Sequence, residues 1–129
     1  YVRSGSDQAT RERVFQDWYR RELRTRAVPL METWAEAFGI DVPKWGIKRM
    51  KTKWGTCNIE AKRVWLNLEL VKKPPQCLEY VVVHELAHFF ERNHSDRFVA
   101  LLDQKLPQWR LIRDELNAAP LAHEEWPIS

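Results

Sequence analysis

The first third of the chain places apolar side chains three or four residues apart, or at multiples of that spacing, with Arg and Glu between them. These positions are Val14, Trp18, Leu23, Leu30, Trp34 and Phe38. The period is typical of an amphipathic helix and predicts helical structure from about residue 7 to residue 38. Pro29 interrupts it, which favours either two helices or one helix kinked near residues 27–28. Gly39 suits the C-terminal end, and we expect this segment to support the layer that carries the chemistry.

The pattern changes after Trp45. Residues 46–50 alternate apolar and basic side chains, as a strand with one exposed face does, and residues 63–68 form a second strand candidate. Residues 58–62 are typical of a turn between them, so we predict an antiparallel hairpin of these two strands. Gly55, in the intervening segment, indicates a bulge or a close backbone approach.

The second half of the chain is again helical in pattern. A helix is predicted to begin shortly after Pro74 and Pro75 and to continue into residues 84–88, because residues 79–83 contain neither Gly nor Pro. Ser95 is a good N-cap for a further helix, which Pro107 limits. A last helix is expected at residues 108–116, followed by an irregular tail.

Three of the four histidines lie within residues 84–94, where the sequence reads His-Glu-Leu-Ala-His-Phe-Phe-Glu-Arg-Asn-His. On a helix, His84 and His88 project from the same face and can hold one metal ion. Glu85 lies about 100° around the helix, where it can reach a water at the metal without being a ligand. This spacing predicts a metal-dependent hydrolase in which Glu85 is the general base.

His94 can be a third metal ligand only under a further condition. If the helix continued, His94 would lie roughly 9 Å further along the axis than His88, so the helix must end soon after His88 and the chain must turn back. Because no glycine is present in this turn, we expect Asn93 to adopt the left-handed conformation. Glu91 stays open as an alternative carboxylate ligand. We expect one Zn²⁺ ion, although other divalent transition metals also suit imidazole.

Composition limits the class of protein. The 129 residues fit one domain, and a hydrophobic fraction of 44% with seven Trp indicates a globular core. No apolar run approaches the roughly 20 residues of a membrane span, and no signal-peptide pattern is visible. Cys57 and Cys77 lack metal-knuckle spacing, so we expect free thiols and a cytoplasmic protein. We expect residues 1–6 to be a truncated or tag-like start and residues 7–129 to be a single domain, the C-terminal part of a longer protein.

Charge is unevenly distributed. Residues 1–53 carry 12 Lys/Arg against 7 Asp/Glu, whereas residues 54–129 carry 9 against 11. A basic first half favours an anionic partner, but solvated helix faces explain the excess as well. We therefore assign no nucleic-acid-binding residue. Nucleic acid remains an alternative partner, and its phosphates would be contacted by Arg20, Arg21, Arg24, Arg26, Lys44, Lys48, Lys51 and Lys53.

Several motifs occur together in order. They are Lys-Thr-Lys-Trp-Gly-Thr-Cys at residues 51–57, Trp-Leu-Asn at 65–67, Tyr-Val-Val-Val-His-Glu-Leu-Ala-His at 80–88, and His94-Ser95 with Phe98. Over about residues 15–126 the chain resembles the YgjP-like metal-dependent hydrolases, relatives of the SprT-like and WLM families of zincin-type peptidases. The resemblance implies an α+β, zincin-like minimal metallopeptidase core. This core has a long supporting helix, a small mainly antiparallel sheet, the HExxH helix and C-terminal helices. It also implies His84, His88 and His94 as metal ligands and Glu85 as general base.

Peptidases of this geometry often bind substrate as an extra strand at a sheet edge, and we predict residues 63–68 for that role. Trp54, Leu66 and Asn67 are the candidate substrate-binding residues. Cys57 as a fourth ligand would close the site, so we assign it to packing. The candidates for stabilising an oxyanion are Asn67, Arg92 and His123.

The leading hypothesis is a zinc-dependent hydrolase, first of all a peptidase acting on proteins or peptides, with no membrane association and an undefined oligomeric state. Two alternatives stay open. One is a nucleic-acid-associated, SprT-like protease acting on DNA-bound proteins. The other is a non-catalytic metal-binding interaction module, which Glu85 disfavours.

Overall fold

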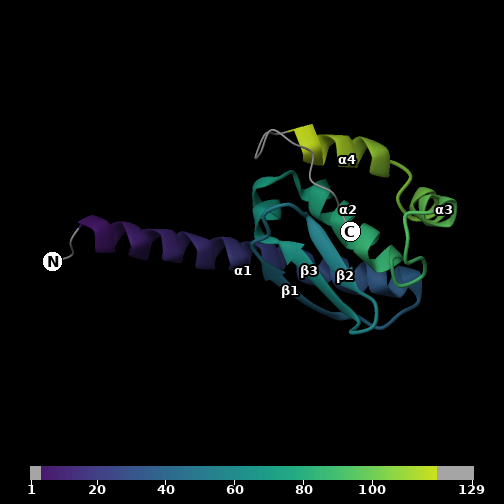
Figure 1. Ribbon diagram of the computed structural model, residues 1–129, viewed down its shortest axis with the longest axis horizontal. Helices are drawn as coiled ribbons and strands as arrows, with labels where there is room; N and C mark the ends of the chain where they lie inside the picture. The colour runs from purple at the N-terminus through teal and green to yellow at the C-terminus, as the bar shows by residue number, and fades with distance from the viewer. Residues whose placement is uncertain (1–3, 119–129) are drawn as a thin grey trace.

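The computed structural model describes residues 4–118, which form four α-helices and a three-stranded sheet (Figure 1). The elements are α1 (Ser4–Phe38), β1 (Lys44–Lys48), β2 (Gly55–Asn58), β3 (Arg63–Asn67), the 3₁₀ helix η1 (Leu68–Lys72), α2 (Pro75–Ala87), α3 (Asp96–Lys105) and α4 (Trp109–Ala118). The predicted α+β class and the order of the helices are confirmed. Strand β2 and helix η1 were not predicted.

Helix α1 is a single helix of 35 residues that passes through Pro29, so of the two predicted alternatives the one with two separate helices is excluded. It ends as expected at Gly39, which has a φ of +73°. The amide of Gly39 donates to the carbonyl of Glu36, and that of Ile40 to the carbonyl of Ala35, each at 3.0 Å. These are the two hydrogen bonds of a Schellman motif, which satisfies carbonyls that the last turn would otherwise leave without donors.

Only the C-terminal half of α1 packs against the body of the protein. Its buried side chains recur every three or four residues, at Leu23, Ala27, Met31, Ala35 and Phe38. The N-terminal half projects away from the sheet (Figure 1), and Val14 and Trp18 keep 58% and 50% of their surface exposed. The helical period therefore predicted the helix correctly, but the apolar residues of its N-terminal half stay exposed.

The sheet has the strand order β1-β3-β2, with β1 parallel and β2 antiparallel to β3. The predicted hairpin of residues 46–50 with residues 63–68 is therefore wrong. The antiparallel partner of β3 is β2, because a short turn with Lys62 at φ 53° joins the two strands directly. Since β3 lies in the centre, it cannot receive a substrate strand, and β2 is the free edge that lies beside α2.

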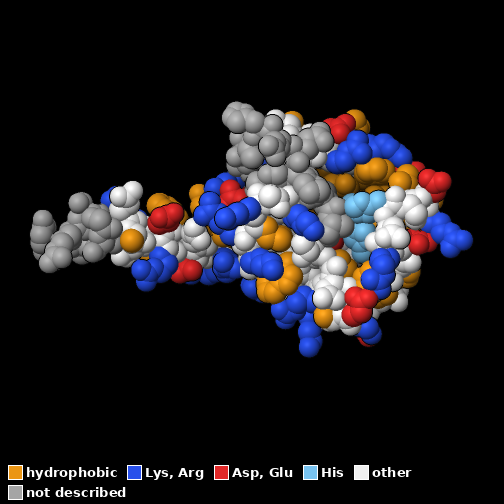
Figure 2. All heavy atoms as spheres, in the orientation of Figure 1, with side chains coloured by type: hydrophobic (Ala, Val, Ile, Leu, Met, Phe, Trp, Pro, Cys, Tyr) orange, Lys and Arg blue, Asp and Glu red, His pale blue; other side chains and the backbone are white. Residues whose placement is uncertain are grey.

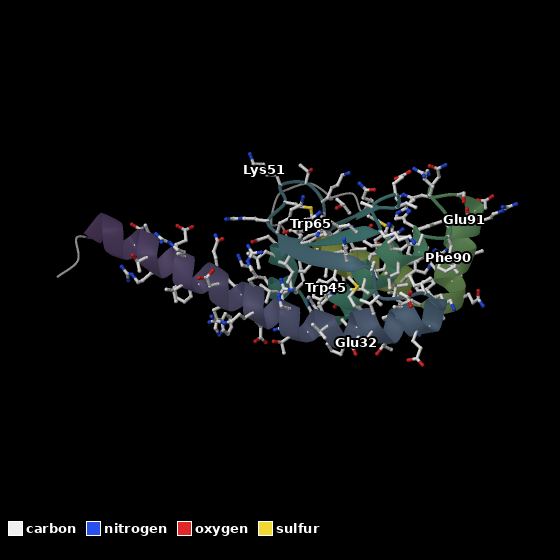
Figure 3. The ribbon with its side chains drawn as sticks, turned by 90° about the horizontal axis from the view of Figure 1, so that it is seen from below. Glu32, Trp45, Lys51, Trp65, Phe90 and Glu91 are labelled. Carbon is white, nitrogen blue, oxygen red and sulfur yellow. The ribbon has the colours of Figure 1, made fainter. Side chains whose placement is uncertain are left out.

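Strand register divides the sheet into two faces. Trp45, Ile47, Val64 and Leu66 lie on the face turned to the helices. Lys44, Lys48, Arg63 and Trp65 lie on the opposite face. Figure 3 shows Trp45 between the sheet and α1, and Trp65 on the far side of the sheet.

Helix α2 is the centre of the core. It starts with Pro75 in its first turn, as predicted, and every residue from Tyr80 to Ala87 is buried. Glu79, at its partly exposed edge, accepts a hydrogen bond of 2.9 Å from the Trp34 indole of α1. Cys57 and Cys77 are free thiols, and the described part of the chain contains no helix that is long and apolar enough to cross a membrane.

Candidate metal centre

Three histidine side chains converge at the C-terminal end of α2. The Nε2 atom of His94 lies 3.1 Å from that of His88 and 3.2 Å from that of His84. Three nitrogens bound tetrahedrally to zinc at 2.0–2.1 Å would lie about 3.3–3.4 Å apart, so the spacing fits one ion. A hydrogen bond through one shared proton would explain the close approach of two of these nitrogens, but not of all three. His84 and His88 are buried and His94 is exposed, so the cluster opens to solvent on one side (Figure 2).

The early end of α2 brings His94 into this cluster. The helix ends at Ala87, and the amides of His88, Phe89 and Phe90 donate to the carbonyls three residues before them. Glu91 N then donates to the Ala87 carbonyl at 3.1 Å. This tightened turn needs no left-handed residue, and Lys62 is the one non-glycine residue with positive φ in the described chain, so the prediction for Asn93 is wrong.

Two contacts hold the turn. The His88 Nδ1 atom lies 3.1 Å from the Glu91 carbonyl, which can only accept, so Nδ1 carries the proton and directs Nε2 into the cluster. The Phe90 ring stacks on Phe38 at the end of α1, with ring centroids 5.6 Å apart. Glu91 is not part of the group of possible ligands found among the described residues.

Phe98 forms the floor of the cluster. Its ring centroid lies 4.7 Å from that of His88 and 4.9 Å from those of His84 and His94. It is buried in the first turn of α3, where its amide donates to the Ser95 side chain at 3.3 Å, so the predicted N-cap is confirmed. The N-cap fixes where α3 begins and therefore where Phe98 meets the imidazoles.

Glu85 is fully buried and lies against the edge strand β2. A Cβ atom at Gly55 would come within 3.0 Å of Glu85 Oε2 and 2.8 Å of Val81 Cγ1. The close backbone approach expected at Gly55 is therefore present, and it is made to the carboxylate beside the histidines. Burial, followed by the charges of Glu85 and Glu60, raises the pKa of the Cys57 thiol to about 12, so this thiol is neutral at physiological pH.

An open cleft of about 310 Å³ adjoins the cluster. It is lined by Cys57, Asn58, Ile59, Glu60, His88 and Arg92. Its walls are β2 with the following turn on one side and the segment after α2 on the other. An ion pair of 2.6 Å between Arg92 and Glu60 links these walls, and the Arg92 guanidinium holds the pKa of the Glu60 carboxyl below its usual value.

The chain matches the sequence profile of the family described as YgjP-like, metallopeptidase domain, over residues 1–119. It belongs to the YgjP-like metallopeptidase family. No curated protein matches it. Solved structures with a similar fold include the metallopeptidase zymogen of Pyrococcus abyssi abylysin, with a TM-score of 0.64 and 21% identity over 70% of this chain and 90% of that one. Another is the metallopeptidase zymogen of Methanocaldococcus jannaschii jannalysin, with a TM-score of 0.60 and 23% identity over 68% and 90%.

The candidate substrate-binding residues of this YgjP-like domain are buried within the fold. Trp54 and Leu66 are buried in the core, and Trp54 Nε1 donates to Asn117 at 3.2 Å. Asn67 is fully buried; it donates to the carbonyls of Met50 and Lys53 and caps η1 by accepting from the Glu69 amide. Burial and these contacts give all three side chains a role in the fold.

Of the three residues considered for stabilising an oxyanion, Arg92 lines the cleft. The Asn67 side chain is buried and hydrogen-bonded to backbone groups, and His123 lies outside the described residues. Phe98 and Gly55 were not predicted as parts of the site. Phe98 follows the third histidine by four residues in an apolar helix pattern, and that pattern alone indicates a core residue.

Phe98→Leu should weaken zinc binding about tenfold while the domain stays folded, because the three imidazoles lose the ring that orients them. Zinc affinity would be measured by competition with a chromogenic chelator. The matched control is Leu102→Ala, one turn further along α3, which should lower the free energy of unfolding by about 2–5 kcal/mol but leave zinc affinity unchanged. Equal zinc affinity in Phe98→Leu and the unaltered protein would contradict this role.

Proposed function

We propose that this domain is a zinc-dependent peptidase in which His84, His88 and His94 bind the ion and Glu85 is the general base. The observation that carries the proposal is the convergence of three Nε2 atoms, two of their separations being 3.1 and 3.2 Å, beside a buried carboxylate and an open cleft. Three imidazoles leave a fourth coordination position, as catalytic zinc sites do.

The substrate would bind along β2. This strand is the sheet edge next to α2, and the cleft follows its end from Cys57 to Glu60 and reaches His88. An extended peptide that adds to this edge makes main-chain hydrogen bonds independently of its sequence. It would run past the histidine cluster, whereas β3, the strand predicted for this role, is covered on both sides.

When bound, zinc supplies a water of lowered pKa and polarises the scissile carbonyl. Glu85 takes the proton from the attacking water and delivers it to the amine that leaves. Its burial against Gly55 keeps the carboxylate away from bulk solvent. The hydrogen bond of His88 Nδ1 to the Glu91 carbonyl keeps the His88 ring fixed during this transfer.

Glu85→Gln should lower kcat for peptide hydrolysis by a factor of about 10²–10⁴, because the amide cannot accept the proton, and should leave zinc stoichiometry at one. The measurement is mass-spectrometric detection of cleavage products from a mixed peptide library, with zinc content determined on the same samples. Glu91→Gln is the matched control and should retain both activity and zinc. If the unaltered protein binds zinc at a ratio of one but cleaves no peptide, the domain is a non-catalytic metal-binding module.

Gly55→Ala should reduce hydrolysis at least tenfold with zinc binding retained, because the added methyl group displaces Glu85 or Val81 and such overpacking costs about 1–3 kcal/mol. Gly39→Ala serves as the comparison. It has no atom within 4 Å of the added Cβ but carries a φ of +73°, so it should lose stability and keep its rate. Unchanged hydrolysis by Gly55→Ala would show that β2 does not position Glu85.

A further inference from the structure

The face of the sheet turned away from the helices collects positive charge. Strand register places Lys44 and Lys48 of β1 beside Arg63 of β3 on this face, with Trp65 between them. Lys51 and Lys53 follow in the exposed loop that leads into β2. We call these six residues the basic face. Figure 2 shows Lys and Arg side chains over the strands, on the same side of the molecule as the histidines.

The charge of this region has one sign. Residues 42–59 contain five Lys and Arg residues and no Asp or Glu. Within that segment, Arg49 is the one cation with a carboxylate of the described chain within ion-pair distance, Glu69 at 3.9 Å. A solvated face normally mixes both signs, whereas an uninterrupted positive field attracts an anionic partner.

Trp65 gives the basic face an aromatic centre. Gly46 lies beside its ring, and a Cβ atom there would come within 2.6 Å of the ring carbon Cζ3, so glycine is what allows the indole to lie across β1. The Lys48 ammonium and the Arg63 guanidinium lie 4.6 and 4.8 Å from the ring centroid. Trp65 is only partly buried, so an apolar, polarisable surface is flanked by cations at a solvent-facing position.

The arginines of α1 differ from the basic face. Arg20 donates to the Ile47 carbonyl, Arg26 donates to Glu22 and to the Val71 carbonyl, and the Arg24 guanidinium lies 5.3 Å from the Trp45 ring. Those three side chains join α1 to the sheet and to η1. Arg20, Arg24 and Arg26 are thus directed to the sheet and η1, whereas Lys44 and Lys48 lie on the outer face of the sheet and Lys51 and Lys53 in the loop beside it.

We propose that the basic face binds single-stranded nucleic acid, with phosphates at Lys44, Lys48 and Arg63 and a base against Trp65. Surfaces that bind single strands without sequence preference combine cations that follow the phosphates with aromatic side chains on which bases stack. An acidic peptide would match the charges but would make no specific use of the indole. The proposal does not depend on peptidase activity.

The test is fluorescence anisotropy with a labelled 20-nucleotide mixed-sequence DNA strand, titrated with the zinc-loaded protein at several salt concentrations. Affinity should fall steeply as salt rises, because bound phosphates release counterions. Lys44→Gln combined with Lys48→Gln should weaken binding at least tenfold and make the log–log salt slope shallower by about 1.4, since each phosphate contact to a single strand contributes about 0.7. Arg13→Gln combined with Arg97→Gln removes the same charge elsewhere and should change affinity less than twofold.

Trp65→Leu separates stacking from charge. It should weaken DNA binding about tenfold with an unchanged salt slope, and Trp65→Phe should restore most of the affinity. The proposal is overturned if no salt-dependent binding is detected at low salt, or if both double variants lose affinity equally. It is also overturned if a polyglutamate peptide binds as tightly as DNA and Trp65→Leu has no effect, because the partner would then be an acidic protein.

Discussion

The site depends on the termination of α2 immediately after its second histidine. Were the helix to continue, His94 would move away along the axis, and Phe98 with it. Instead, three successive amides bond to carbonyls three residues back, and His88 itself bonds to the Glu91 carbonyl at the far side of the turn. His88 is therefore the cap of the helix, a candidate ligand and the anchor of the turn, so the backbone geometry and the geometry of the candidate metal centre are coupled.

The opposite side of the site is set by the sheet. Because β3 is paired on both sides, β2 becomes the edge beside α2, and Gly55 allows its backbone to approach Glu85. Asn67 stabilises this arrangement from within the core by bonding the loop that precedes β2. The cleft, the buried carboxylate and the free edge are thus consequences of one strand order. The other face of that sheet carries the basic residues, so two surfaces of different chemistry share one small scaffold.

Local signals in the sequence predicted the helices, the His84/His88 pair with Glu85, the end at Gly39 and the N-cap Ser95, since each depends on neighbours a few residues away. Strand order could not be derived in this way, because β1 pairs with β3, a strand from which β2 separates it in the chain. The turn before His94 was predicted with a left-handed Asn93, whereas 3₁₀-type bonds and the stacking of Phe90 on Phe38 form it. Asn67 was considered for substrate binding because its hydrogen bonds to the carbonyls of Met50 and Lys53, 17 and 14 residues earlier, cannot be inferred from local sequence.

The central claim is that His84, His88 and His94 bind one zinc ion together. A crystal structure of the zinc-loaded protein, with anomalous difference maps recorded on both sides of the zinc absorption edge, tests it most directly. We expect one peak about 2.0–2.1 Å from the Nε2 atom of each of the three histidines, with the remaining position facing the cleft. A peak bound by His84 and His88 with His94 turned away, or with Glu91 in its place, would contradict the account.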